Sequence, residues 1–281
     1  MSKPRALRAP SKRAWRVLQN ASDALGAIGA WVFALWYRAS GMSSLGVAVI
    51  WQASRPLTWR RTVQAEFWRH GAQVMLQGLP PIVVTGLLVG IGMVFQVLYW
   101  LQLVGQESVI GEFLVLVLVR EIAPVLVALI VIGRSGAVMI NELGVMRVGG
   151  QAHLLNAQGL DLLHFLVVPR VVAAALGVFC LCIVFLVVAL AAGLVAANTL
   201  GLANTTLFDF LEEVLTAMGP GEYALVPLKT LAMGFAIGVI SCDTGLEVEG
   251  DVMQVAALLP RGFVTSVLAT LLISGVLTIL L

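Results

Sequence analysis

The chain has 281 residues, of which 60% are hydrophobic and 11% are charged. Soluble domains carry about 25% charged residues and could not bury this much apolar surface, so the composition excludes an ordinary soluble enzyme or binding domain. The net charge is +2, yet 11 of the 17 basic residues lie within the first 70 positions, beside only two acidic ones. Basic residues are retained on the cytoplasmic side of membranes, which predicts a cytoplasmic amino-terminal segment.

Residues 1–71 form this basic segment, and residues 72–281 form the predicted membrane domain. Ala24–Tyr37 imitates a signal peptide, but its long basic continuation favours an uncleaved helix that lies in the membrane interface. Trp51–Arg69 mixes tryptophans with arginines and is expected to be a second interfacial stretch on the cytoplasmic surface. An ordinary solvated linker is the alternative for this stretch.

Apolar stretches of about 20 residues recur along the remainder, and a helix of that length crosses the roughly 30 Å of hydrocarbon in a bilayer. A membrane barrel would need alternating polar and apolar residues, which runs such as VLVALIVIG lack. The sequence therefore predicts an all-α membrane protein. Its five spans are expected at about 72–103, 113–140, 165–199, 223–240 and 262–281.

The first span contains two features that bear on its packing. Pro80 and Pro81 remove backbone donors and are expected to kink or restart the helix. Gly86 and Gly90 follow them and form a small-residue face that suits close contact with another helix.

Loop charges bear on the topology independently of hydropathy. The predicted outer loops, 102–112 and 200–222, contain acidic residues and no Lys or Arg, whereas Arg134, Arg147 and Arg261 fall on the inner side. This asymmetry agrees with a cytoplasmic amino terminus, five spans and a periplasmic carboxyl terminus.

The residues indicate no chemistry performed by the chain itself. Cys180, Cys182 and Cys242 lie within or at the end of apolar runs, and the three histidines are isolated, so no metal site is predicted. No G-x-x-x-x-G-K-[ST] phosphate-binding loop occurs, and no nucleophile is paired with a base. We expect a transport subunit and not an enzyme, with no cofactor bound by this chain and no nucleic-acid partner.

The connection between the second and third spans, Asn141–Arg170, is too polar and too rich in glycine to cross lipid. Its leucines allow a short surface helix that a cytoplasmic partner could push, and a plain loop is an equal alternative.

The run REIAPVLVALIVIGRSGAVMINELGVM, Arg120–Met146, followed by LVVPR ending at Arg170, resembles the signature of MlaE-type permeases. These are membrane subunits of ABC transporters that work with MCE proteins to move lipids between bacterial membranes. The likeness covers roughly residues 70–281, whereas residues 1–40 are longer than is usual. The chain also departs from the family pattern near Gly150 and at Asp161–Leu162, and its fifth span lacks an acidic residue near its end.

The resemblance implies a permease that moves lipids between the bacterial inner membrane and the cell envelope, with phospholipids as the leading candidate cargo. It implies a second copy of the chain, a cytoplasmic ABC ATPase that binds ATP and Mg²⁺, a periplasmic MCE lipid-binding protein and a STAS-like accessory subunit. The ATPase is expected to act on Glu142–Asp161. The coupling candidates are Glu142, Gly144, Met146, Arg147, Leu154, Leu155 and Asp161.

Charges inside a membrane are costly and usually face a cavity or a partner, which singles out Arg120, Glu121 and Lys229. The resemblance places the Arg–Glu pair near a lipid pocket at the dimer axis. It places the outer half of the first span there too, with Met93, Val94, Leu98, Trp100 and Leu101. Alternatively, Lys229 only pairs with Glu121 or Glu222 to hold helices together, and the apolar side chains only face bulk lipid.

Two other classes of function compete with a lipid permease. A passive channel or proton-coupled carrier predicts more ionisable residues along a midplane path and often an inverted repeat, and the sequence shows neither. A membrane anchor for an MCE protein would leave the intramembrane charges without a transport role.

Overall fold

The computed structural model describes residues 40–55, 61–104, 110–159, 161–199, 206–248 and 250–280, and every regular element among them is a helix. The predicted all-α class is thereby confirmed. The chain forms two compact units, Met1–Leu45 and Gly46–Leu281, and the second contains all the long helices described below. The predicted interfacial helix at Ala24–Tyr37 lies outside the described residues.

Within the described residues, five helices are long and apolar enough to cross a membrane, as predicted. They are Arg61–Val97, Glu112–Val148, Leu163–Thr199, Gly221–Leu246 and Met253–Leu280. Each of the first three has 37 residues and is therefore about 55 Å long, which exceeds the roughly 30 Å of hydrocarbon. These three helices must continue beyond the apolar layer.

The spans are built from consecutive helical segments. The first comprises α2 (Arg61–Val89), the π-helical η2 (Gly90–Val94) and α3 (Phe95–Val104). The second comprises α4 (Ile110–Leu114), the π-helical η4 (Val115–Ile122), α5 (Ala123–Val131), the π-helical η5 (Ile132–Gly136) and α6 (Ala137–Val148). The third comprises the π-helical η6 (Leu163–Val167) and α8 (Val168–Thr199), while α10 (Pro220–Leu246) and α11 (Val252–Leu280) form the last two.

The first span begins earlier than the sequence predicted. Residues 61–69 of the expected surface stretch belong to α2, and the predicted boundary between residues 71 and 72 falls inside this helix. Hydropathy cannot locate this start, because a helix runs unbroken from the headgroup region into the apolar layer. Residues 40–53 are also helical, and the Arg55 guanidinium lies 3.4 Å from the centre of the exposed Trp51 ring.

The helix α2 passes through Pro80 and Pro81 without restarting, contrary to one of the two expected outcomes. Prolines are tolerated in membrane helices because neighbouring helices and hydroxyls satisfy the freed carbonyls. The two prolines free the carbonyls of Leu76 and Gln77, four residues earlier. The Thr85 hydroxyl makes a local bond of 2.7 Å to a different carbonyl, that of Pro81. The helix instead departs from α geometry at η2, ten residues after the first proline.

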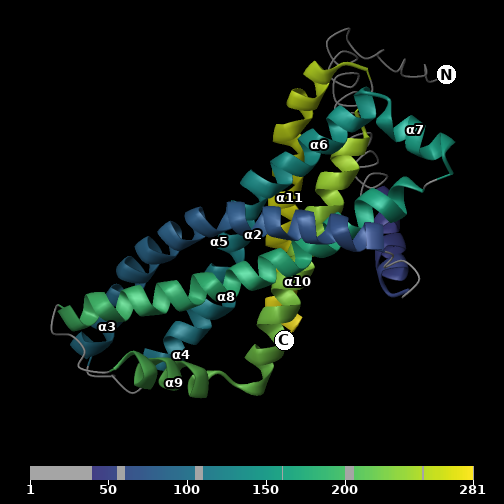
Figure 1. Ribbon diagram of the computed structural model, residues 1–281. Coiled ribbons are helices and arrows are strands. Elements are labelled where there is room, and N and C mark those ends of the chain that lie inside the picture. The colour runs from purple at the N-terminus through teal and green to yellow at the C-terminus, as the bar shows by residue number, and fades with distance from the viewer. Residues whose placement is uncertain are drawn as a thin grey trace, which may run out of the picture. The chain divides into compact units, whose positions relative to one another are not determined.

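The helices α2 and α8 lie side by side (Figure 1). A Cβ on Gly86 would lie 3.2 Å from the Val188 side chain, and one on Gly177 would lie 2.6 Å from the Val74 side chain. Glycines on both helices thus allow the backbones to approach, which confirms the predicted small-residue face of the first span.

The polar connection after the second span is a short helix and not a plain loop. The helix α6 continues the span to Val148, and α7 (Gln151–Ala157) follows it. Gly150 and Gly159 adopt φ angles of 73° and 75°, a left-handed conformation that favours glycine and that ends helices. We call this side of the bundle the α7 end.

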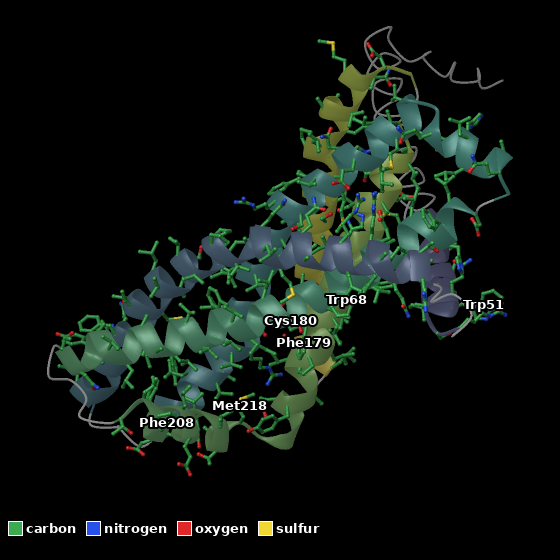
Figure 2. The ribbon with its side chains drawn as sticks, in the orientation of Figure 1. Trp51, Trp68, Phe179, Cys180, Phe208 and Met218 are labelled. Atoms are coloured by element: carbon green, nitrogen blue, oxygen red, sulfur yellow. The ribbon has the colours of Figure 1, made fainter. Side chains whose placement is uncertain are left out.

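The opposite side, the α9 end, carries the amphipathic helix α9 (Leu207–Ala217), which packs against α4 and α8. Thr206 caps it, since its hydroxyl accepts a hydrogen bond from the Asp209 backbone N–H. Phe208 of α9 is 82% exposed (Figure 2).

Candidate functional site

A polar cluster lies among the apolar helices near the α9 end. Lys229 of α10 is fully buried, and its ammonium donates hydrogen bonds to the Glu121 carboxylate at 3.0 Å and to the Thr278 hydroxyl at 3.0 Å. A third bond of 2.8 Å reaches the Arg120 carbonyl. Thr278 donates in turn to Glu121, and Ser274 donates to the same carboxylate at 3.2 Å. The second, fourth and fifth spans therefore meet at one hydrogen-bonded ion pair.

The two charges of this pair differ in their accessibility. The Glu121 side chain is 39% exposed, whereas none of Lys229 is exposed. The buried ammonium satisfies its three donors within the protein, whereas the Glu121 side chain is partly accessible from outside. A polar group that approaches through the membrane can therefore contact Glu121 without displacing Lys229.

Arg120 adds a second, less completely paired cation beside Glu121. Its Nη2 donates to the Thr278 carbonyl at 3.0 Å, and its Nη1 lies 4.0 Å from the Glu222 carboxylate. The Nε atom is buried and has no hydrogen-bond partner among the described residues. Because the Arg120 side chain is 18% exposed and its contact with Glu222 is as long as 4.0 Å, the guanidinium keeps donor capacity for an anionic or hydroxylated group.

Local backbone geometry places Arg120 and Glu121 at this point. Both belong to η4, whose π-helical turns shift the residues after them relative to a regular α-helix, and such turns occur frequently at functional sites. Pro227 precedes Lys229 in α10, and the Thr230 hydroxyl donates to the Pro227 carbonyl at 3.0 Å.

Three of the five apolar residues predicted for the lipid pocket have described side chains, and these three differ in exposure. Val94 is buried, and its side chain lies where a Cβ on Gly193 would stand, so it holds the first and third spans together. Met93 is half-buried and packs against the core, whereas Trp100 is exposed and packs edge to face on Tyr99. The side chains of Leu98 and Leu101 lie outside the described part of the chain.

An apolar hollow of about 510 Å³ does lie between α2 and α8, nearer the α7 end. Trp68 and Cys180, one from each helix, are among its lining residues (Figure 2).

The predicted coupling residues are distributed over α6, α7 and the turn after them. Gly144 is buried, and a Cβ there would lie 2.8 Å from the Val255 side chain of α11. Arg147 and Leu154 are exposed, the latter by 64%, whereas Met146 and Leu155 are half-buried. The Asp161 carboxylate accepts a hydrogen bond of 3.0 Å from the Leu163 backbone N–H.

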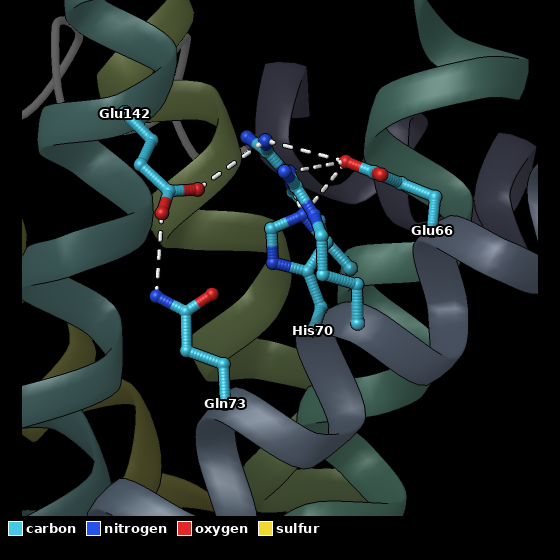
Figure 3. A network of polar contacts seen from close by, with 6 residues as sticks. Glu66, His70, Gln73 and Glu142 are labelled. Carbon is cyan, nitrogen blue, oxygen red and sulfur yellow. Dashed lines mark hydrogen bonds and ion pairs between the residues drawn. The ribbon is translucent and has the colours of Figure 1, made fainter.

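Glu142 points into the bundle. Its carboxylate accepts a hydrogen bond of 3.2 Å from Gln73 and lies 3.4 Å from Nη2 of Arg170 (Figure 3). Glu66 and His70 of α2 complete this second polar cluster, which joins α2, α6 and α8.

Several members of the two clusters were not predicted from the sequence as site residues. Ser274 and Thr278 stand four residues apart in an apolar span, which puts both hydroxyls on one helix face, and this spacing could have revealed them. His70 is isolated in sequence and 100 residues from its partner Arg170, so no local signal announces the pair.

The family model described as permease MlaE matches residues 67–280. A probable ABC transporter permease protein of Synechocystis sp. is 35% identical over 181 residues, which cover 64% of this chain and 68% of that protein. The chloroplastic protein TRIGALACTOSYLDIACYLGLYCEROL 1 of Arabidopsis thaliana is 28% identical over 193 residues, which cover 68% of this chain and 53% of that protein.

A probable ABC transporter permease protein of Rickettsia bellii is 35% identical over 140 residues, covering 50% of this chain and 53% of that protein. The chain thus spans about half the length of the latter two relatives. The family model covers more than three quarters of the chain and includes both polar clusters except Glu66. This chain therefore belongs to the MlaE family of permeases.

Proposed function

We propose that this chain is the permease subunit of an ABC transporter that moves lipids between the bacterial inner membrane and the cell envelope, with phospholipids as the leading candidate cargo. The observation that carries the proposal is the Lys229–Glu121 pair, in which Lys229 is fully buried and the Glu121 side chain is 39% exposed. Charged groups are retained inside membranes chiefly where they serve a polar substrate or partner. A lipid has such a polar group, and its acyl chains need only the apolar surroundings that the spans supply.

The relatives support a lipid as the cargo. One of them carries the name of a galactolipid, trigalactosyldiacylglycerol, and two others are named as probable ABC transporter permeases. A headgroup with hydroxyls and a phosphate could accept from Arg120 and donate to Glu121 at the same site.

Energy would come from a cytoplasmic ATPase that binds ATP and Mg²⁺ and docks on α6 and α7. The exposed Leu154 and Arg147 offer one apolar and one basic contact for it. A periplasmic MCE protein would take up or deliver the lipid at the α9 end, and a second copy of the chain would complete the transporter. In this arrangement the amino terminus is cytoplasmic and the carboxyl terminus periplasmic.

The competing functions make different demands on Glu121. A membrane anchor for an MCE protein would not need this carboxylate, and a passive or proton-coupled carrier would work without an ATPase. An anchor gives no role to a partly exposed intramembrane carboxylate, whereas a proton-coupled carrier could use one, so the need for an ATPase separates that carrier from the proposed permease.

The test begins with the tagged full-length chain, extracted gently in detergent and analysed by mass spectrometry for bound proteins and lipids. We expect an ABC ATPase, an MCE protein and phospholipid. The recovered complex is then placed in liposomes, and ATP-dependent transfer of a fluorescent phospholipid to acceptor vesicles is measured. Glu121→Lys should abolish most transfer, and Glu247→Lys, the same substitution at an exposed position away from the α9 end, should not. Unchanged transfer by an intact Glu121→Lys complex would refute the proposed site.

A further inference from the structure

A buried arginine joins three helices at the α7 end. Arg170, at the start of α8, has no exposed surface. Its Nε donates a hydrogen bond of 2.8 Å to Nε2 of His70, and its Nη2 lies 3.4 Å from the Glu142 carboxylate and 3.9 Å from Glu66 (Figure 3). The cation therefore lies between α2, which carries His70 and Glu66, and α6, which carries Glu142.

The hydrogen bonds of this network are incomplete. A guanidinium has five N–H donors, and among the described residues Nη1 and Nη2 of Arg170 have no hydrogen-bond partner. The Oε2 atom of Glu142 is also buried and without one, although it lies 3.4 Å from Nη2. Buried charged groups that lack hydrogen bonds raise the free energy of the arrangement that contains them, so a nearby arrangement that supplies the bonds is favoured.

Only a small displacement would be needed to form the missing bond between Glu142 and Arg170. Charged N–H···O bonds have lengths of about 2.7 to 2.9 Å, so α6 needs to approach α8 by less than about 1 Å to form one between Glu142 and Arg170. Glu142 lies on the same helix as the exposed Arg147, and α7 follows directly. A partner that pushes on α6 and α7 therefore acts on this distance.

His70 has two competing hydrogen-bond partners within the same network. Its Nε2 atom lies 2.8 Å from Nε of Arg170 and 3.0 Å from the Glu66 carboxylate. One ring nitrogen cannot accept a hydrogen bond from Arg170 and donate one to Glu66 at the same time. When Arg170 moves toward Glu142, His70 becomes free to change its partner on α2.

The start of α8 also lies in close backbone contact with α10, the helix that carries Lys229. A Cβ on Gly238 of α10 would lie 2.8 Å from the Cα of Val171, the neighbour of Arg170. A Cβ on Gly234 would lie 2.7 Å from the Cα of Ala175. The two backbones are therefore in direct contact, so a displacement of Arg170 with α8 acts on α10, the helix that carries Lys229 of the polar cluster near the α9 end.

We propose that Arg170 is a positioning residue, and that its alternative pairing with Glu142 or with His70 and Glu66 forms a two-state joint. The joint transmits a displacement of α6 and α7 to α8 and α10, and thereby to Lys229 and Glu121. This inference rests on the proposed function, because an ATPase must supply the displacement. It assigns to Glu142 an inward role, in addition to the surface contact expected for its helix.

The test measures how much lipid is moved for each ATP hydrolysed. The tagged full-length chain and its co-purified ATPase are reconstituted, and release of inorganic phosphate and transfer of a fluorescent phospholipid are recorded in the same sample. The variants are Glu142→Gln, Arg170→Gln and the double variant. Glu247→Gln is the matched control, because Glu247 is exposed and its ion pair with Arg261, at 3.9 Å, is exposed too.

In Glu142→Gln and Arg170→Gln we expect the ATPase to remain bound and to continue to hydrolyse ATP. The amount of lipid moved per ATP should fall by about fivefold or more, because coupling between two sites typically changes an equilibrium by at least about that factor. The double variant should move no less lipid per ATP than the more impaired single variant, because both substitutions remove the same Glu142–Arg170 contact. Should Arg170→Gln fail to fold, Glu142→Gln alone decides the result, since the Glu142 side chain is partly exposed and Gln has nearly the same shape.

An unchanged ratio of lipid to ATP in Glu142→Gln would overturn the joint while leaving the proposed function intact, and so would fully multiplicative losses in the double variant. A wild-type chain that recovers no ATPase would overturn the proposed function and the joint with it.

Discussion

Gly90 of η2 and Ala189 of α8 approach so closely that a Cβ on Gly90 would lie 2.1 Å from the Ala189 carbonyl oxygen. No side chain can occupy that position unless one backbone moves. Gly90→Ala should therefore separate the first and third spans and lower stability by about 1 to 3 kcal/mol, the usual effect of overpacking. Thermal unfolding in detergent would show it as a lower midpoint, whereas Gly92→Ala, which meets open space, should behave as wild type. Equal losses in both variants would contradict the close contact.

Lys229→Met should leave the Glu121 carboxylate without its cation inside the membrane domain. Breaking a buried ion pair costs about 3 to 5 kcal/mol, and the partial exposure of Glu121 places this case near the lower end. Adding Glu121→Gln should restore part of the stability, because the uncompensated charge is then removed. The measurement is the thermal midpoint of the two single variants and the double variant. Strictly additive losses would show that the two side chains do not interact.

Thr278→Val keeps the side-chain shape but removes the hydroxyl that accepts from Lys229 and donates to Glu121. We expect a stability loss of about 1 kcal/mol and a lower rate of lipid transfer, because the carboxylate loses a fixed position. Thr265→Val is the control on the same helix, since its hydroxyl only donates to the Arg261 carbonyl. Identical transfer rates for the two variants would exclude Thr278 from the site.

Leu154→Glu replaces an exposed apolar side chain of α7 with a charge. If the ATPase docks there, recovery of the ATPase with the tagged chain should fall about tenfold, because a central apolar contact is worth more than about 1.4 kcal/mol. Gln151→Glu, an exposed change on the same helix, should have little effect. Undiminished recovery with Leu154→Glu would move the docking surface away from α7.

The five spans and the intramembrane charges could be predicted from the sequence because lipid acts locally on each residue. Each apolar run must be long enough to cross the bilayer, and each charge within it is conspicuous. The Lys229–Glu121 pair was one of the predicted alternatives, but the hydroxyl partners of these charges were not predicted. Lys229 and Thr278 lie on different spans, and only the packing of α10 against α11 brings them together.

The cluster around Arg170 was harder to predict for the same reason. Arg170 belongs to the motif that suggested the family, and Glu142 to the expected coupling segment, but neither motif indicates that the two residues meet. The early start of α2 was also missed, because its first turns contain arginines and tryptophan that resemble a surface stretch. Those turns place Glu66 and His70 beside Arg170.

The most direct measurement compares phospholipid transfer by the purified chain in liposomes with and without its co-purified ATPase and ATP. We predict transfer only when both are present, and its loss in Glu121→Lys. Transfer by the chain alone at the same rate, with no dependence on ATP, would contradict an ATP-driven permease.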